Sequence, residues 1–97
     1  MQFLLRAYDG KDEGAMARRM DIRPQHLAYV QEFREKGHIL YAGPLLNDEN
    51  EMCGSMMVLD FPSKAELAAW QEKEPYVTQG VWKEIYVEAM RVADVFL

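Results

Sequence analysis

The chain has 97 residues, which is the size of one domain with a single core, so an organisation in two domains is excluded. Its 16 acidic and 11 basic residues give a net charge of −5, and the basic residues are scattered along the chain. Nucleic-acid binding is therefore not expected, because contacts to phosphates require a concentrated positive surface.

The sequence also predicts a cytoplasmic protein without disulfide bonds or membrane spans. Cys53 is the single cysteine, so it has no partner for an internal disulfide. No apolar run approaches the roughly 20 residues that cross a bilayer. The N-terminus lacks the charged-then-apolar layout of a signal peptide. We therefore expect no association with a membrane.

The N-terminal part of the chain predicts a strand, a turn and a short helix. Residues 2–8 alternate between two sets of side chains, which is typical of a strand. Asp9 and Gly10 then indicate a turn. Residues 12–20 form a charged segment with alanine and methionine, and we expect a short helix there.

A second helix and a second strand are expected next. A residue that precedes proline disfavours the helical conformation, so the pair Arg23 and Pro24 predicts a break. The second helix should then run over residues 24–36, opened by the proline and ended by Gly37 as a left-handed cap. Residues 38–45 are expected to form the second strand.

The second half of the chain contains a loop, a strand and a helix. Residues 46–53 are polar and acidic, which indicates an exposed hairpin loop, and residues 54–61 predict the third strand. Ser63 is suited to cap the following helix, which should extend to about residue 73, and Glu66 completes a capping box.

A final strand over residues 82–92 completes the order strand, helix, strand, strand, helix, strand. This order predicts an α+β, ferredoxin-like fold with a four-stranded antiparallel sheet. The third and fourth strands are largely apolar on both faces, although helices cover only one face of such a sheet. Because monomers seldom expose so large an apolar patch, we expect a homodimer packed through the sheet faces.

His26 is the first candidate for chemistry. It lies in the first turn of the second expected helix, beside Leu27, Val30 and Phe33, which repeat at helical spacing. An inward-facing histidine at this place is either a packed core residue or a positioned base. Taken alone, the packed residue is the better interpretation, and only the surroundings of His26 reverse it.

Several separated motifs resemble the YCII-related, or YciI-like, family in matching order and spacing over essentially the whole chain. They are Arg19, Arg23-Pro24-x-His26, Ala42-Gly43-Pro44, Gly54-Ser55, and Glu74-Pro75-Tyr76-Val77 with Gly80-Val81. The resemblance implies that residues 1–97 form a single YCII-related domain, folded as a dimeric ferredoxin-like α/β barrel. It also implies an active site with a His-Asp dyad. Many family members have no known activity, whereas the characterised chemistry includes dehydrochlorination of chlorinated hydroxyquinols with the histidine as base.

The resemblance assigns the dyad histidine to His26 and its acidic partner to Glu74. The family has aspartate before the proline of its Asp-Pro-Tyr motif, so the glutamate is a departure. Glutamate keeps the charge but adds one methylene, and its carboxylate must fold back or approach the ring from another angle. The residues that the resemblance places at the substrate or around the acid are Arg19, Ser55, Pro75 and Tyr76.

These residue types make a coherent set for proton transfer. An imidazole that donates one N–H to a carboxylate is a better oriented and stronger base. A nearby arginine stabilises an enolate or phenolate oxygen, and a serine hydroxyl fixes a second oxygen. We therefore expect a cofactor-free enzyme in which His26 catalyses an elimination, isomerisation or related step on a small aromatic or enolisable compound. Two histidines 12 residues apart, without a cysteine pair, do not predict a metal site.

Other interpretations stay open at this point. The chain can be a non-catalytic dimeric module that binds a small metabolite or supports a partner enzyme, and an oxygenase of the same barrel class shares the fold. Glu74 can be a solvated acid in a turn, and Ser55 a plain strand residue. Arg19 can pair at the surface, where Arg18 is an equal candidate. The distance between His26 and Glu74 discriminates enzyme from module, since a hydrogen bond favours the enzyme.

Overall fold

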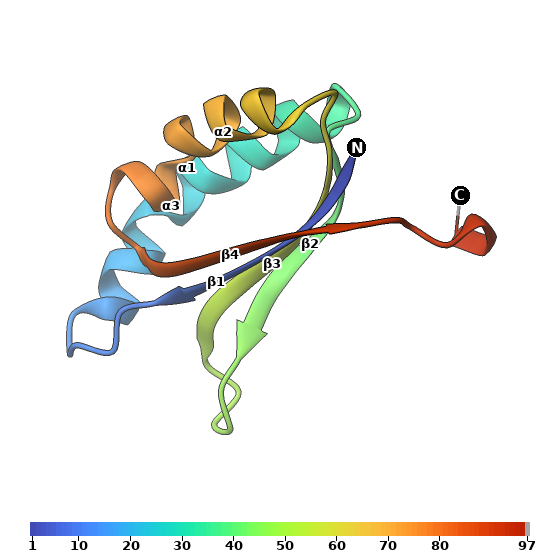
Figure 1. Cartoon of the computed structure of the whole chain (residues 1–97). Helices are drawn as coiled ribbons and strands as arrows, with labels where there is room; N and C mark the ends of the chain where they lie inside the picture. The colour runs from blue at the N-terminus through green and yellow to red at the C-terminus, as the bar shows by residue number, and fades with distance from the viewer. Residues whose placement is uncertain (97) are drawn as a thin grey trace.

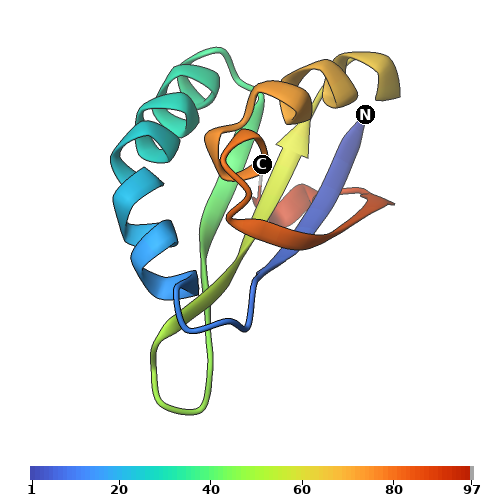
Figure 2. The ribbon, with the colours of Figure 1, turned by 90° about the vertical axis from the view of Figure 1, so that its left-hand side faces the viewer.

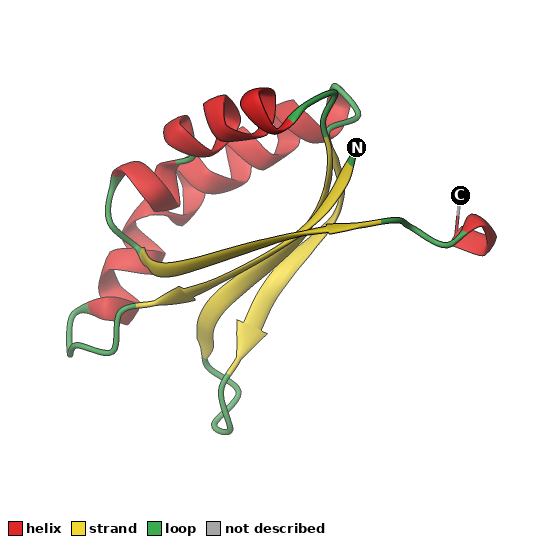
Figure 3. Ribbon diagram, viewed as in Figure 1, coloured by secondary structure: helices red, strands yellow, loops and turns green. Residues whose placement is uncertain are grey.

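Three helices cover one face of a four-stranded antiparallel sheet and leave the other face open (Figures 1 and 3). The structure is a computed structural model that describes residues 1–96. Its elements are β1 (Gln2–Asp9), α1 (Ala15–Glu35), β2 (Ile39–Leu46), β3 (Met52–Asp60), α2 (Lys64–Lys73), α3 (Pro75–Thr78), β4 (Trp82–Met90) and the 3₁₀ turn η1 (Asp94–Phe96). The strand order β2-β3-β1-β4 and the antiparallel pairs confirm the predicted α+β, ferredoxin-like class.

The loops and ends follow the sequence closely. The β2–β3 hairpin projects beyond the layer of helices (Figure 2), and the chain leaves the sheet after β4, which ends two residues before the predicted limit. Gly37 has a φ of 81°, the left-handed conformation expected of a cap after α1. Ser63 Oγ accepts the backbone N–H of Glu66 at 3.2 Å and caps α2 as predicted.

A single helix, α1, stands where two were expected. Pro24 lies in its interior, so the predicted break at Arg23 and Pro24 is wrong. Proline removes one hydrogen bond of the helix and crowds the preceding turn, which usually ends or bends a helix. Here the helix is held on both sides of the proline, because Ile22 before it and His26 after it are buried. Tertiary packing therefore outweighs the local preference, and His26 lies in mid-helix, not in a first turn.

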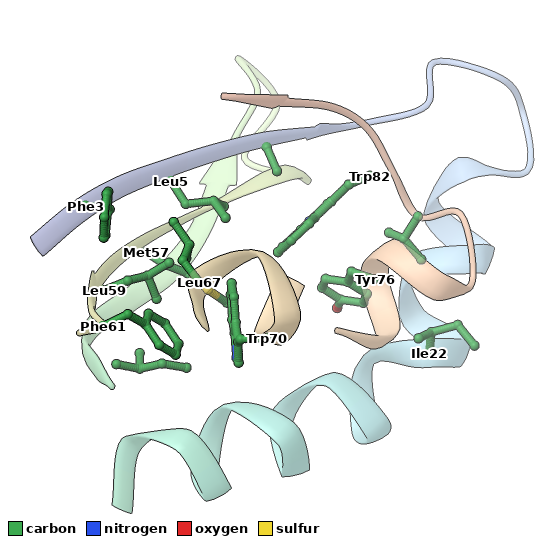
Figure 4. Packing of buried hydrophobic residues seen from close by; sticks show 13 residues of the cluster. Phe3, Leu5, Ile22, Met57, Leu59, Phe61, Leu67, Trp70, Tyr76 and Trp82 are labelled. Carbon is green, nitrogen blue, oxygen red and sulfur yellow. The ribbon is translucent and has the colours of Figure 1, made fainter. Parts of the chain in front are cut away.

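The core lies between the helices and the inner face of the sheet. Phe3 pairs with Leu59 and Leu5 with Met57 across β1 and β3, and all four side chains are at most 2% exposed. These residues pack against Leu67 and Trp70 of α2, and the core continues toward Tyr76 and Trp82 (Figure 4). The aromatic end of the core, formed by Tyr76 and Trp82, lies where the last residue of β1 pairs with the first residue of β4.

The outer face of the sheet carries a mixed surface. Leu4, Val58 and Tyr41 lie in register across β1, β3 and β2, and Tyr41 is 71% exposed. At the other edge, Arg6 lies over the ring of Tyr86 at 5.2 Å. This face is therefore apolar toward β2 and more polar toward β4. None of the helices formed by residues 1–96 is long and apolar enough to cross a membrane.

Candidate functional site

His26 of α1 and Glu74 at the junction of α2 and α3 are in direct contact, although 48 residues separate them. The distance from His26 Nδ1 to Glu74 Oε1 is 2.6 Å. The histidine is 7% exposed and the glutamate 0%. A solvated turn acid, one of the interpretations open from the sequence, is therefore excluded.

Local backbone geometry explains how a glutamate reaches the imidazole. Glu74 has an extended backbone between the two helices, with φ −66° and ψ 125°, and it is the N-cap of α3. Its side chain folds back over the first turn of α3, where Oε1 also accepts the backbone N–H of Tyr76 at 3.3 Å. The extra methylene relative to aspartate is accommodated by this fold-back. Pro75 occupies the first position of α3, a place that suits proline.

The contacts of Glu74 fix the tautomer of His26. The oxygens of an ionised carboxylate are acceptors only, so Oε1 of the Glu74 carboxylate accepts from the ring as well as from the backbone, and the proton of the short contact belongs to Nδ1. Nε2 then carries a lone pair, and it forms no hydrogen bond with any group of residues 1–96. The free nitrogen is the one that can take up a proton.

Two aromatic rings hold the plane of the imidazole. Tyr76 stacks on His26 with centroids 3.9 Å apart and an interplanar angle of 10°. Trp82 meets His26 edge-on at 6.0 Å, and the Tyr76 and Trp82 rings, both visible in Figure 4, lie 5.6 Å apart. Burial raises the pKa of Tyr76 above its ordinary value, although the charge of Arg19 opposes this, so the phenol is neutral at physiological pH.

Arg19 is buried and paired inside the protein. Its Nη1 donates to both carboxylate oxygens of Asp9, at 3.0 and 3.1 Å, and its Nη2 donates to Ser55 Oγ at 3.0 Å. The surface pairing considered from the sequence is wrong for Arg19. It is Arg18 that pairs with Asp12 at the surface, at 2.7 Å.

Trp82 completes this polar network. Its Nε1 donates to Ser55 Oγ at 3.2 Å, so the serine links the arginine to the indole. Ser55 reaches this place because the preceding Gly54 packs against the Ala7 carbonyl of β1, where a Cβ atom has no room. Burial raises the pKa of Asp9, and the guanidinium of Arg19 counteracts the rise.

A cavity of about 240 Å³ lies beside the imidazole. A cavity of about 150 Å³ holds benzene in another protein, so this one has room for a single substituted ring. Among residues 1–96 there is no group of three or more metal-ligating side chains. The cavity is lined by Arg19, Arg23, His26, Leu27, Val30, Ala42, Gly43, Pro44, Ser55, Met56, Met57 and Tyr76.

Three of the four residues expected at the substrate line the cavity, and the fourth does not. Arg19, Ser55 and Tyr76 reach the cavity wall, whereas Pro75 does not and instead starts α3 behind the acid. Leu27, expected in the buried stripe of its helix, is 44% exposed and lies at the cavity. The wall thus combines a few polar groups with an otherwise apolar surface, as small-molecule sites usually do.

Three residues of the site escaped the sequence analysis. Asp9 follows Phe3, Leu5 and Ala7 on the inward face of β1, and the same alternation, continued by one step, indicates an inward acid. Arg23 lies in a family-like motif but received no role. Trp82 had no signal beyond its position at the start of a strand, because its bond to Ser55 depends on the tertiary fold.

Buried polar atoms without a hydrogen-bond partner gather in the same region. Within residues 1–96 they are Arg19 Nε, Glu74 Oε2 and Tyr76 Oη, with Trp70 Nε1 further along the core. Native interiors leave few such groups without a partner, so this cluster is unusual for a protein core.

Comparisons of the sequence with family models and with known proteins point to the same family. The YCII-related domain matches residues 1–91. Protein YciI of Escherichia coli O6:H1 is 31% identical, and the alignment covers 94% of this chain and 97% of that protein. A protein of Haemophilus influenzae is 28% identical over 78% of this chain and 84% of its own.

Two solved structures are similar in fold. One is 5-chloro-2-hydroxyhydroquinone dehydrochlorinase (TftG) from Burkholderia phenoliruptrix AC1100 in complex with 2,5-dihydroxybenzoquinone, with a TM-score of 0.82, 27% identity and 98% of both chains covered. The other is a dimeric ferredoxin-like protein of unknown function from Jannaschia sp. CCS1, with a TM-score of 0.52, 19% identity, and 94% of this chain and 98% of that chain covered. Together with the domain match, these relatives establish that the chain belongs to the YCII-related family.

Proposed function

We propose that the chain is a small cofactor-independent enzyme in which His26 is the general base for proton transfer on a small oxygenated ring or an enolisable compound. The observation that carries this proposal is the 2.6 Å contact between His26 Nδ1 and Glu74 Oε1 beside a ring-sized cavity. The contact leaves Nε2 free to act, and it is the feature that favours an enzyme over a binding module.

Each polar group has a defined task in such a step. Nε2 of His26 takes a proton from a hydroxyl or an acidic C–H, and the carboxylate of Glu74 stabilises the imidazolium that forms. Ser55 and the guanidinium of Arg19 lie at the wall to stabilise the substrate oxygen on which negative charge develops. The stacked ring of Tyr76 keeps the imidazole plane fixed during the transfer.

The similarity to TftG supports dehydrochlorination as the first reaction to test. For a chlorinated hydroxyhydroquinone, a phenolic proton moves to the carbon that bears chlorine and makes it tetrahedral. Nε2 then removes a second phenolic proton, and the O–H bond pair forms the second bond of a carbonyl. The adjacent ring double bond shifts to the carbon that bears chlorine, and the C–Cl bond pair leaves with chloride. The net change is loss of HCl, and no oxidant or reductant is consumed.

We also propose that a second copy of the chain covers the outer face of the sheet. Tyr41 is 71% and Tyr86 45% exposed on this face, beside the half-buried Leu4 and Val58. A helix layer covers only the inner face, and contiguous apolar surface of this kind is seldom left in contact with water. The Jannaschia protein of the same fold is dimeric.

The test of the catalytic proposal is release of chloride from 5-chloro-2-hydroxyhydroquinone. A panel of small phenols and enolisable acids, scored by NMR for deuterium uptake from solvent, extends the assay beyond that compound. His26→Gln should lower the rate by about 10²- to 10⁴-fold, the usual contribution of a general base.

His38→Gln is the matched control, since Nδ1 of His38 binds the Asp60 carbonyl at 2.8 Å and His38 does not line the cavity. It should leave the rate unchanged. A His26→Gln variant as active as the parent would contradict the proposal, and binding without turnover across the whole panel would favour a module.

A further inference from the structure

The hydroxyl of Ser55 receives hydrogen bonds from two groups that are unable to accept one. Nη2 of Arg19 lies 3.0 Å and Nε1 of Trp82 lies 3.2 Å from Ser55 Oγ. Guanidinium and indole are donors only, whereas a hydroxyl offers two lone pairs and one hydrogen. Both lone pairs of Oγ are therefore occupied, and the only bond left for Ser55 to make is one in which it donates.

The direction of that remaining bond follows from the geometry of the oxygen. Cβ and the two donors take three of the four tetrahedral directions around Oγ, so the hydrogen takes the fourth. The O–H of Ser55 finds no acceptor within residues 1–96, and the residue, 3% exposed, belongs to the cavity wall. Since Ser55 lines this cavity, its hydrogen can face it.

The two donors are themselves held rigidly. Arg19 is fixed by its bidentate bond to Asp9, which is 7% exposed. Trp82 is 5% exposed and packs edge-on against Tyr76, as Figure 4 shows. Neither group can turn away without breaking buried contacts, so the fold determines the polarity of the serine.

We propose that Trp82 is a positioning residue that, together with Arg19, makes Ser55 an obligate hydrogen-bond donor to the cavity. The cavity then prefers a ligand oxygen with a free lone pair and no hydrogen: a phenolate, enolate or carbonyl oxygen on a small planar ring. A ring nitrogen group that can only donate meets the Ser55 hydrogen and is disfavoured. The ligand class rests on the proposed function, whereas the donor arrangement is independent of turnover.

Binding measurements without turnover test the proposal. Isothermal titration with 2,5-dihydroxybenzoquinone, which presents acceptor oxygens, is compared with titration of 1,4-diaminobenzene, a planar ring that carries N–H donors and no oxygen. The parent should favour the dihydroxy compound. Trp82→Phe keeps an aromatic ring but removes the N–H, and it should weaken binding of that compound about five- to tenfold and narrow the ratio of the two affinities.

A double-mutant cycle separates positioning from general damage. If Trp82 acts through the serine, Trp82→Phe should cause no further loss of affinity in a Ser55→Ala background. Ser55→Cys, which is similar in size, replaces Ser55→Ala if the latter fails to fold. Trp70→Phe is the matched control, because Trp70 is 3% exposed and its Nε1 has no partner among the residues described. It should leave both affinities unchanged.

The outcomes distinguish this inference from the proposed function. Unchanged affinities in Trp82→Phe, equal losses in both backgrounds, or no saturable binding of the dihydroxy compound to the parent would overturn it. Coupling between Trp82 and Ser55 in a protein that turns over no compound would uphold the inference and contradict the proposed function. Turnover that depends on His26, in a protein without coupling between Trp82 and Ser55, would uphold the proposed function and contradict this inference.

Discussion

The imidazole of His26 and the phenol ring of Tyr76 are stacked almost in parallel, with centroids 3.9 Å apart. The stack joins the middle of α1 to the short helix α3, and it restricts the plane in which the free Nε2 lies. Tyr76 is completely buried, and its hydroxyl has no hydrogen-bond partner within residues 1–96. The ring and the hydroxyl can therefore be tested separately.

Replacement of Tyr76 should separate the two parts of the side chain. Tyr76→Leu removes the stacked ring, and we expect kcat/KM to fall roughly 10- to 100-fold, because a base misplaced by about 1 Å loses rate on that scale. Tyr76→Phe keeps the stack and should retain most of the activity and the full unfolding free energy. Chloride release and urea denaturation measure the two effects. Equal rates in both variants would show that the stack has no part in orienting the base.

The charge of Glu74 should matter more than its length. Glu74→Gln keeps the size and can still cap α3, but it removes the negative charge beside the imidazole, so we expect kcat to fall by about 10²-fold or more. Glu74→Asp keeps the charge on a shorter side chain and should retain more activity than the glutamine variant. Steady-state kinetics give kcat for both variants. A higher kcat for Glu74→Gln than for Glu74→Asp would contradict the prediction that the charge matters more than the length.

Arg23 should supply the positive charge that a substrate anion meets. The charge of Arg19 is matched by the buried carboxylate of Asp9, whereas Arg23 lines the cavity and forms no ion pair within the part of the chain that the structure describes. Arg23→Gln should raise KM roughly tenfold and leave kcat nearly unchanged. Arg34→Gln, at an exposed position of the same helix, is the control. A fall in kcat alone would assign Arg23 to the chemical step instead.

Tyr29 should make the protein lose stability at high pH. Its hydroxyl donates to the Trp70 carbonyl at 2.7 Å, and burial, with smaller effects of Glu74 and Glu32, raises the pKa of Tyr29 from 10.0 to about 12. Between these values the unfolded chain releases a proton that the folded chain keeps. The stabilisation is therefore complete below about pH 10 and is lost as the pH approaches 12.

Tyr29→Phe tests this assignment by urea denaturation at a series of pH values. The variant should be less stable by about 1 kcal/mol at neutral pH, because it lacks one hydrogen bond. Its unfolding free energy should fall less steeply above pH 10 than that of the parent. Parallel alkaline curves for Tyr29→Phe and the parent would refute the role of Tyr29.

A charge on the outer sheet face should separate the proposed dimer. Val58 lies between Leu4 and Tyr41 on that face, so Val58→Lys should give a monomer by size-exclusion chromatography with light scattering. Met20→Lys changes an apolar residue of α1 that is 48% exposed on the other side of the molecule, and it should leave the mass unchanged. A monomeric parent protein would rule the dimer out.

The sequence was sufficient for the fold because each strand and the second long helix carry local signals. Alternation marks β1, Gly37 ends α1, and Ser63 caps α2 as expected. Pro24 predicted a break that does not occur, since the local cost of a proline inside a helix is outweighed by buried residues on both sides. Local sequence signals indicate the backbone conformation that a residue prefers, and tertiary packing can override this preference, as it does at Pro24.

The site was only partly accessible from the sequence. Family-like motifs singled out His26 and Glu74, yet spacing alone does not reveal a contact across 48 residues. Asp9 was interpreted only as part of a turn, although it ends the inward face of β1. The role of Trp82 was not predictable, because its hydrogen bond to Ser55 depends on how β4 and β3 lie on either side of β1.

Glu74, the acid of the site, is held in place by α3, one of the shortest elements of the fold. One oxygen of Glu74 holds both the imidazole and the start of α3, a helix of 4 residues that also carries Tyr76. Fraying of that single turn would detach the acid and the stacked ring together while the sheet stayed intact, since short elements open at lower free energy than the core. On warming, such a protein would lose its activity at a temperature well below that of global unfolding.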